Sequence, residues 1–121
     1  MTNILCIGIG GFIGAIFRYL ISIYTSKLFL SKIPIGTLIA NVSGGLLIGF
    51  IMEMSLKTNL ISPHLKLFLT TGLMGGLTTF STFSYETVIL IEGGRFVFAT
   101  LNIILNLFLS LISVSIGKFL I

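Results

Sequence analysis

The sequence predicts an all-α membrane protein with four transmembrane helices, from its composition and from the spacing of its charges. Of 121 residues, 55% are hydrophobic and 8% are charged, against about 25% charged in an ordinary soluble domain. Charged residues are absent from 1–17, 33–52, 67–85 and 96–117. Because a helix needs roughly 20 apolar residues to span a bilayer, each of these stretches is long enough for one transmembrane helix. The small number of charged residues also excludes a water-soluble domain, because they could not cover its surface.

The expected helices lie within a single transmembrane domain, residues 1–121, near residues 4–24, 35–54, 65–91 and 95–120. The first is not typical of a cleaved signal peptide, since no basic residue precedes it and Arg18 interrupts its apolar run. Before the third, Ser62 is expected as N-cap and Pro63 as the first helical residue. Short connectors leave no room for a soluble catalytic domain, and no catalytic set, metal-ligand cluster or phosphate loop indicates an enzyme.

Glycines four residues apart predict close packing of the first two helices. Gly10 and Gly14 share a face of the first, and Gly45 and Gly49 share a face of the second. Small residues at this spacing let membrane helices approach closely. The pattern predicts tight contacts and identifies no function.

The third span is poorly suited to continuous helix. Gly75 and Gly76 lie near its middle and are followed by the β-branched Thr78 and Thr79. Interrupted backbone at bilayer depth must be buried in protein or line a wet cavity, because an unsatisfied amide in lipid costs several kcal/mol. We therefore predict a broken third helix, whose exposed ends favour ions.

Side chains after the predicted break suit a small anion. Phe80 and Phe83 share a helical face, and Ser81 and Thr82 add hydroxyl groups around them. The positive edges of two aromatic rings attract an anion weakly. Alternatively, the rings face lipid and the hydroxyls bond back to their own helix.

Polar stripes on two other helices supply further hydrogen-bonding groups: Thr37 and Asn41 in the second, and Asn102, Asn106, Ser110 and Ser113 in the fourth. Amides are costly in lipid unless they face the bundle, so these stripes form either an ion track or contacts that hold helices together. Arg18, the one basic residue well inside a span, would raise the local anion concentration or anchor a helix break.

Basic residues divide almost evenly between the two membrane faces. With four spans, three lie on each side, and Arg18 is nearer the second: Lys57, Lys66 and Lys118 against Lys27, Lys32 and Arg95. The positive-inside rule then assigns no orientation. This predicts insertion in both orientations or dependence on a partner, and the lack of a basic cluster argues against nucleic-acid binding.

Three motifs resemble those of the CrcB or Fluc family of small fluoride channels: residues 10–19, 36–44 and 75–84. They follow in the family's order, and the resemblance extends over nearly the whole chain. It implies an antiparallel, dual-topology dimer in the bacterial plasma membrane, whose two four-helix subunits enclose two fluoride pathways. The partner is a second copy or a paralogue.

The resemblance also implies roles for individual residues. A structural Na⁺, not itself transported, would be held by the backbone carbonyls of Gly75 and Thr78 from both subunits. Arg18 and Glu86 would lie near the break or a vestibule. The family's polar track includes a tyrosine and serines, and here Asn102, Asn106 and Ser110 occupy its positions. For the fluoride pathway it implies Asn41, Phe80 and Phe83, and we expect the hydroxyls of Ser81 and Thr82 to belong to the same pathway. Thr37 is expected in the polar track.

The predicted function is passive, fluoride-selective export across the plasma membrane, with no ATP site. One alternative is a small multidrug-type, proton-coupled transporter, which needs a membrane-embedded carboxylate where the first span carries Arg18. A second is a non-conducting scaffold subunit whose polar stripes only hold helices together.

Overall fold

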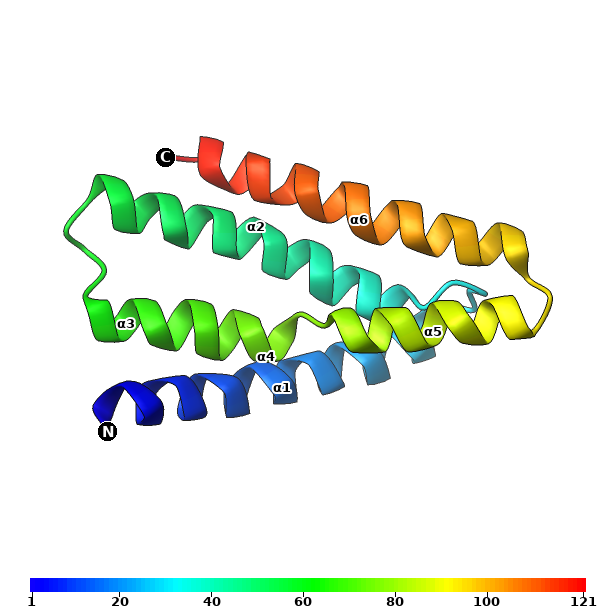
Figure 1. Ribbon diagram of the computed structural model, residues 1–121, viewed down its shortest axis with the longest axis horizontal. Helices are drawn as coiled ribbons and strands as arrows, with labels where there is room; N and C mark the ends of the chain where they lie inside the picture. Colours follow the sequence, from blue (N-terminus) through cyan, green and yellow to red (C-terminus); the bar gives the residue numbers. More distant parts are fainter.

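Three long helices frame the molecule (Figure 1). In the computed structural model, which describes residues 1–121, they are α1 (Thr2–Leu28), α2 (Ile35–Lys57) and α6 (Phe96–Phe119). Each is long and apolar enough to cross a membrane. The first two run about one turn beyond the expected ends. Their last turns contain Lys27 and Lys57, and the helix C-terminus favours a positive charge there.

Between α2 and α6 the chain forms a series of shorter helices, all-helical like the rest: α3 (Pro63–Leu67), the π-helix η1 (Phe68–Met74), α4 (Gly75–Leu77) and α5 (Phe80–Glu92). The Ser62 hydroxyl accepts the N–H of Leu65 at 3.2 Å, with Pro63 in the first turn of α3. The predicted start of this segment at Ser62 and Pro63 is confirmed.

The extended backbone in this segment follows the glycines rather than including them. Gly75 and Gly76 are helical, whereas Thr78 (φ −87°, ψ 154°) and Thr79 (φ −152°, ψ 125°) are extended. We name Thr78 and Thr79 the extended pair. β-branched residues favour extended backbone, and the N–H that Thr79 withdraws from the helix finds an acceptor in Asn41.

Glycine pairs bring helix backbones into direct contact in two places. α1 packs along η1 and α4, and α2 packs along α6. At Gly14, as at Gly10, a Cβ atom would collide with η1 backbone, in this case the Leu73 carbonyl. At Gly49 a Cβ would collide with the Val114 carbonyl of α6, and at Gly45 it would meet the Ser113 hydroxyl of the same helix. The predicted close packing at both glycine pairs is confirmed.

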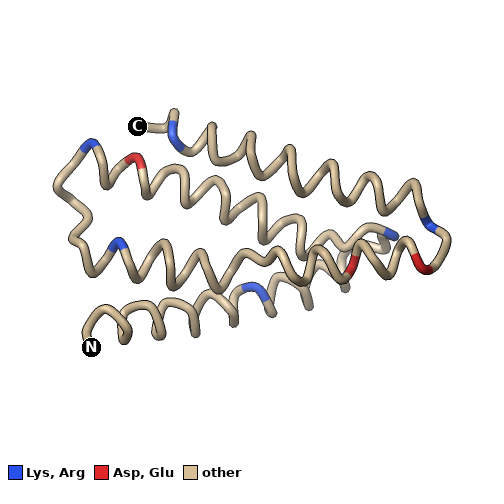
Figure 2. The backbone as a smooth tube through the Cα atoms, viewed as in Figure 1, with Lys and Arg blue, Asp and Glu red and all other residues tan.

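Charged positions gather mainly at the two ends of the bundle (Figure 2), and both termini lie at the same end (Figure 1). Glu53 in α2 pairs with Lys57 at 3.1 Å and with Lys118 in α6 at 3.9 Å. Between the ends, large apolar side chains such as Phe12 and Phe108 remain exposed. An apolar belt between charged ends is the surface expected of a protein surrounded by lipid.

Candidate functional site

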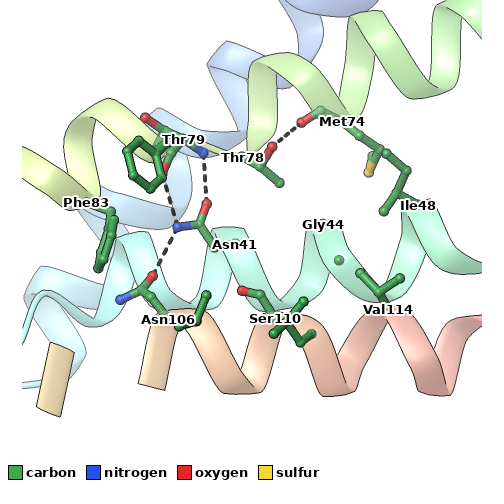
Figure 3. Close-up of a pocket in the computed structure, with 14 residues that line it drawn as sticks. Asn41, Gly44, Ile48, Met74, Thr78, Thr79, Phe83, Asn106, Ser110 and Val114 are labelled. Carbon is green, nitrogen blue, oxygen red and sulfur yellow. Dashed lines mark hydrogen bonds between the residues drawn. The ribbon is translucent and has the colours of Figure 1, made fainter. Parts of the chain in front are cut away.

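Side chains from two other helices satisfy the backbone around the extended pair. The N–H of Thr79 donates to Asn41 Oδ1 at 2.8 Å, and the Thr79 carbonyl accepts from Asn41 Nδ2 at 3.1 Å (Figure 3). Arg18 Nε in α1 donates to the carbonyl of Gly76 at 3.0 Å. The chain can leave the helix here because α1 and α2 supply these partners.

The carbonyls of Gly75 and Thr78 are among those that lose the partners of a continuous helix at the extended pair. The N–H of Thr79 would reach the Gly75 carbonyl but goes to Asn41. The N–H of Thr82 would reach the Thr78 carbonyl but goes to the Thr79 hydroxyl at 3.1 Å, which caps α5. The oxygens of Gly75 and Thr78 are thereby released from helix bonding, and hard carbonyl oxygens suit a cation such as Na⁺.

A chain of hydrogen bonds runs from α2 through α6 to α5. Asn41 Nδ2 donates to Asn106 Oδ1 at 3.0 Å, and Asn106 Nδ2 donates to the Asn102 carbonyl at 2.9 Å and to its Oδ1 at 3.0 Å. Asn102 Nδ2 donates to Thr87 Oγ1 at 2.9 Å, and Thr87 Oγ1 donates to the Phe83 carbonyl at 2.8 Å. We name Asn41, Asn106, Asn102 and Thr87 the amide relay.

The interior members of the relay are removed from solvent and lipid. Exposed fractions are 0% for Asn102, 5% for Asn106 and 6% for Thr87. Burial of this degree makes each of their hydrogen bonds costly to lose. The hydrogen bonds of the relay therefore hold α2, α5 and α6 together.

A cavity of about 370 Å³ opens beside the relay and the extended pair. Asn41, Asn106 and Ser110 lie on its wall (Figure 3). Phe80 and Phe83 form another part of the wall, with ring centroids 5.6 Å apart and planes tilted by 57°. The Phe80 side chain is 79% exposed, so the cavity is open on that side in the single chain.

Comparison with known proteins identifies the family. Residues 5–118 match the family described as CrcB-like protein, Camphor Resistance (CrcB). The chain belongs to the CrcB family. A Clostridium perfringens (strain 13) relative named fluoride-specific ion channel FluC is 60% identical over 114 residues, 94% of this chain and 89% of the relative. Relatives with the same name from Shewanella baltica (strain OS185) and Ruminiclostridium cellulolyticum are 49% identical over 118 residues and 48% over 120, covering 98% and 99% of this chain and 94% and 92% of theirs.

In this CrcB protein, the predicted site residues do not all lie on one cavity wall. One group lines the cavity: Asn41, Thr78, Phe80, Phe83, Asn106 and Ser110. Ser81 and Thr82 instead turn their hydroxyls toward the Thr79 hydroxyl, at 3.4 and 3.1 Å. Asn102 belongs to neither group, because it is enclosed within the relay and does not reach the cavity wall.

Thr37 and Glu86 lie in a different part of the CrcB chain. Both line a second hollow of about 520 Å³, between the α1–α2 connector and α5. The Oε1 atom of Glu86 is buried and makes no hydrogen bond within the chain. The structure thus brings these two residues together but away from the phenylalanine pair.

Thr87 is the site residue that the sequence interpretation missed. It follows Phe83 by one helical turn, which places both on the same side of α5. Its partner Asn102 lies in another helix across the α5–α6 turn. A threonine in an apolar helix does not by itself predict a contact with another helix. The polar stripe of the fourth span, which contains Asn102, was the only sequence signal for this contact.

Proposed function

We propose that this CrcB protein is a fluoride-selective channel that lets fluoride leave the cell passively across the plasma membrane. The names of relatives up to 60% identical, over 94% of this chain, support the proposal. The structural observation that carries it is the single cavity shared by the rings of Phe80 and Phe83 and the amides of Asn41 and Asn106. That combination offers one small anion weak electrostatic attraction and amide N–H groups for which it can compete with protein acceptors.

The proposed membrane arrangement has four spans, with α3 to α5 together forming the third. The extended pair then lies within this span and makes it a broken helix. Both termini lie at the same end of the bundle (Figure 1), as an even number of crossings requires. The hydrogen bonds from Asn41 and Arg18 support this arrangement, since broken backbone at bilayer depth needs protein partners.

A second copy of the chain, inserted in the opposite orientation, is proposed to cover the open side of the cavity. The highly exposed Phe80 ring lies on that side. The nearly equal numbers of basic residues at the two ends support dual insertion, because neither end is favoured on the cytoplasmic side. The proposed assembly is therefore an antiparallel homodimer.

A structural Na⁺ is proposed between the two copies, held by the carbonyls of Gly75 and Thr78. These oxygens fit the ion because the N–H groups that would occupy them are bonded elsewhere. Gly75 is exposed, so the backbone here lies at a surface that a second copy could reach. Bound there, the cation would hold the two broken helices against each other.

Conduction in this proposal follows from the cavity residues. Fluoride entering a cell as the neutral acid dissociates at cytoplasmic pH, and the membrane potential then drives the anion outward. Asn41 and Asn106 replace part of its hydration, and the ring edges of Phe80 and Phe83 attract it weakly enough for release. Ser81 and Thr82 are proposed to serve the same pathway from the first turn of α5.

The charge carried by the first span does not favour the transporter alternative. A proton-coupled multidrug transporter needs an embedded carboxylate, and α1 carries Arg18 instead. Arg18 is proposed to anchor the break and to raise the local anion concentration. Glu86 is proposed to lie at a vestibule, as the hollow beside it suggests.

Efflux from proteoliposomes tests the function. Vesicles loaded with potassium fluoride and diluted into fluoride-free buffer should release fluoride to an ion-selective electrode when valinomycin is added. Vesicles loaded with chloride should release little. Proton-coupled uptake of a cationic drug would instead support the transporter, and absence of any flux would support the scaffold.

A further inference from the structure

The hydrogen bonds of the amide relay have a direction that is determined at both ends. At one end the backbone N–H of Thr79 can only donate, so the oxygen of Asn41 must face it. At the other end the single hydroxyl proton of Thr87 is given to the Phe83 carbonyl. The Thr87 oxygen therefore accepts from Asn102, and the amide orientations between the two ends follow.

This direction leaves no free amide proton on the cavity wall. The two N–H groups of Asn41 go to the Thr79 carbonyl and to Asn106. The two of Asn106 both go to Asn102. An anion in the cavity can obtain an amide proton only by displacing one of these protein acceptors.

Such a competition discriminates between anions by size. Electrostatic attraction to an N–H group rises as the distance falls, so the smallest halide competes best with a neutral amide or carbonyl oxygen. A larger halide gains less and does not recover the cost of the broken protein bond. A relay whose donors are already occupied is thus more selective than one with free donors.

Building on the proposed fluoride pathway, we propose that the amide relay sets anion specificity and that Thr87 is its positioning residue. Thr87 does not line the cavity. It acts through Asn102, whose Nδ2 atom has Thr87 Oγ1 as its side-chain acceptor in a fully enclosed place. Without that acceptor, the Asn102 amide turns toward another partner and no longer accepts from Asn106, which releases a donor to the cavity.

The test is Thr87→Val, which removes the hydroxyl with little change in shape. Bilayer recordings in a fluoride/chloride gradient give the permeability ratio from the reversal potential. We expect this ratio to fall by about fivefold, the equilibrium factor for one neutral hydrogen bond, with an unchanged elution volume in detergent. Thr87→Ser, which keeps the hydroxyl, should restore the original ratio.

Thr100→Val is the matched control. The Thr100 hydroxyl makes the same bond one turn back, to the Phe96 carbonyl at 2.9 Å, but accepts from no amide. An unchanged ratio in Thr87→Val overturns the inference, as does an equal fall in Thr100→Val. If the valine variant does not assemble, Thr87→Cys, with its weakly accepting thiol, decides by the same criterion. A lack of fluoride current in the unaltered chain would instead contradict the proposed channel.

Discussion

Arg18 should stabilise the chain through its bond to the Gly76 carbonyl, and Arg18→Met removes the donor while keeping an unbranched side chain. The Nε–oxygen distance is 3.0 Å and the side chain is half-buried. A hydrogen bond to a charged group contributes about 1.5–3 kcal/mol, and partial exposure places this one near the lower value. A loss of about 1.5 kcal/mol raises the unfolding constant by roughly tenfold.

Unfolding in mixed micelles, with rising mole fraction of dodecyl sulfate, measures this loss. The chain has no tryptophan, so far-ultraviolet circular dichroism is the suitable signal. Arg18→Gln, which keeps a neutral donor, should lose about half as much.

Lys27→Met is the matched control for the loss of a positive charge. The Lys27 ammonium lies 5.9 Å from the Tyr24 ring and forms no ion pair in the structure. We expect its replacement to change the free energy of unfolding by less than about 0.5 kcal/mol. Equal losses in Arg18→Met and Lys27→Met would refute a specific role for the Gly76 bond.

Three further outcomes are expected. Phe80→Ile and Phe83→Ile, which remove the polar ring edges, should each abolish fluoride efflux from proteoliposomes without altering the elution volume; normal efflux in both would exclude the rings from the pathway. Replacing Na⁺ by N-methylglucamine throughout purification should reduce efflux, and returning Na⁺ should restore it; full activity without Na⁺ would argue against the proposed cation site. Gly14→Val should lower the free energy of unfolding by about 1–3 kcal/mol through overpacking against η1, whereas Gly8→Val, where a Cβ meets nothing within 4 Å, should not; similar values for the two would contradict the close approach of α1.

Local chemistry explains which features could be predicted. The all-helical character and the three long apolar helices follow from charge-free stretches whose length matches a bilayer. The glycine pairs and the Ser62 cap can also be predicted from the sequence, because a helical face and an N-cap depend only on residues that are close together in the chain.

The position of the extended backbone could not be predicted as well from the sequence. Helix propensity directs attention to Gly75 and Gly76, yet both are helical and the extended residues follow them. The chain leaves the helix where a remote acceptor is present, and that acceptor, Asn41, is 38 residues away in sequence. Helix propensity describes how costly it is for a residue to leave a helix. It does not show where another helix supplies hydrogen-bond partners for the released backbone groups.

By itself, the sequence determined that this protein lies in a membrane, that it is helical and which family it belongs to, because composition, spacing and motifs are properties of the chain alone. Only the tertiary structure decided what each polar group does. Asn102 and Asn106 belong to one stripe, yet one is enclosed against Thr87 and the other lines the cavity. The reason is physical: a buried amide must be paired, and its partner is chosen by whichever helix packs against it.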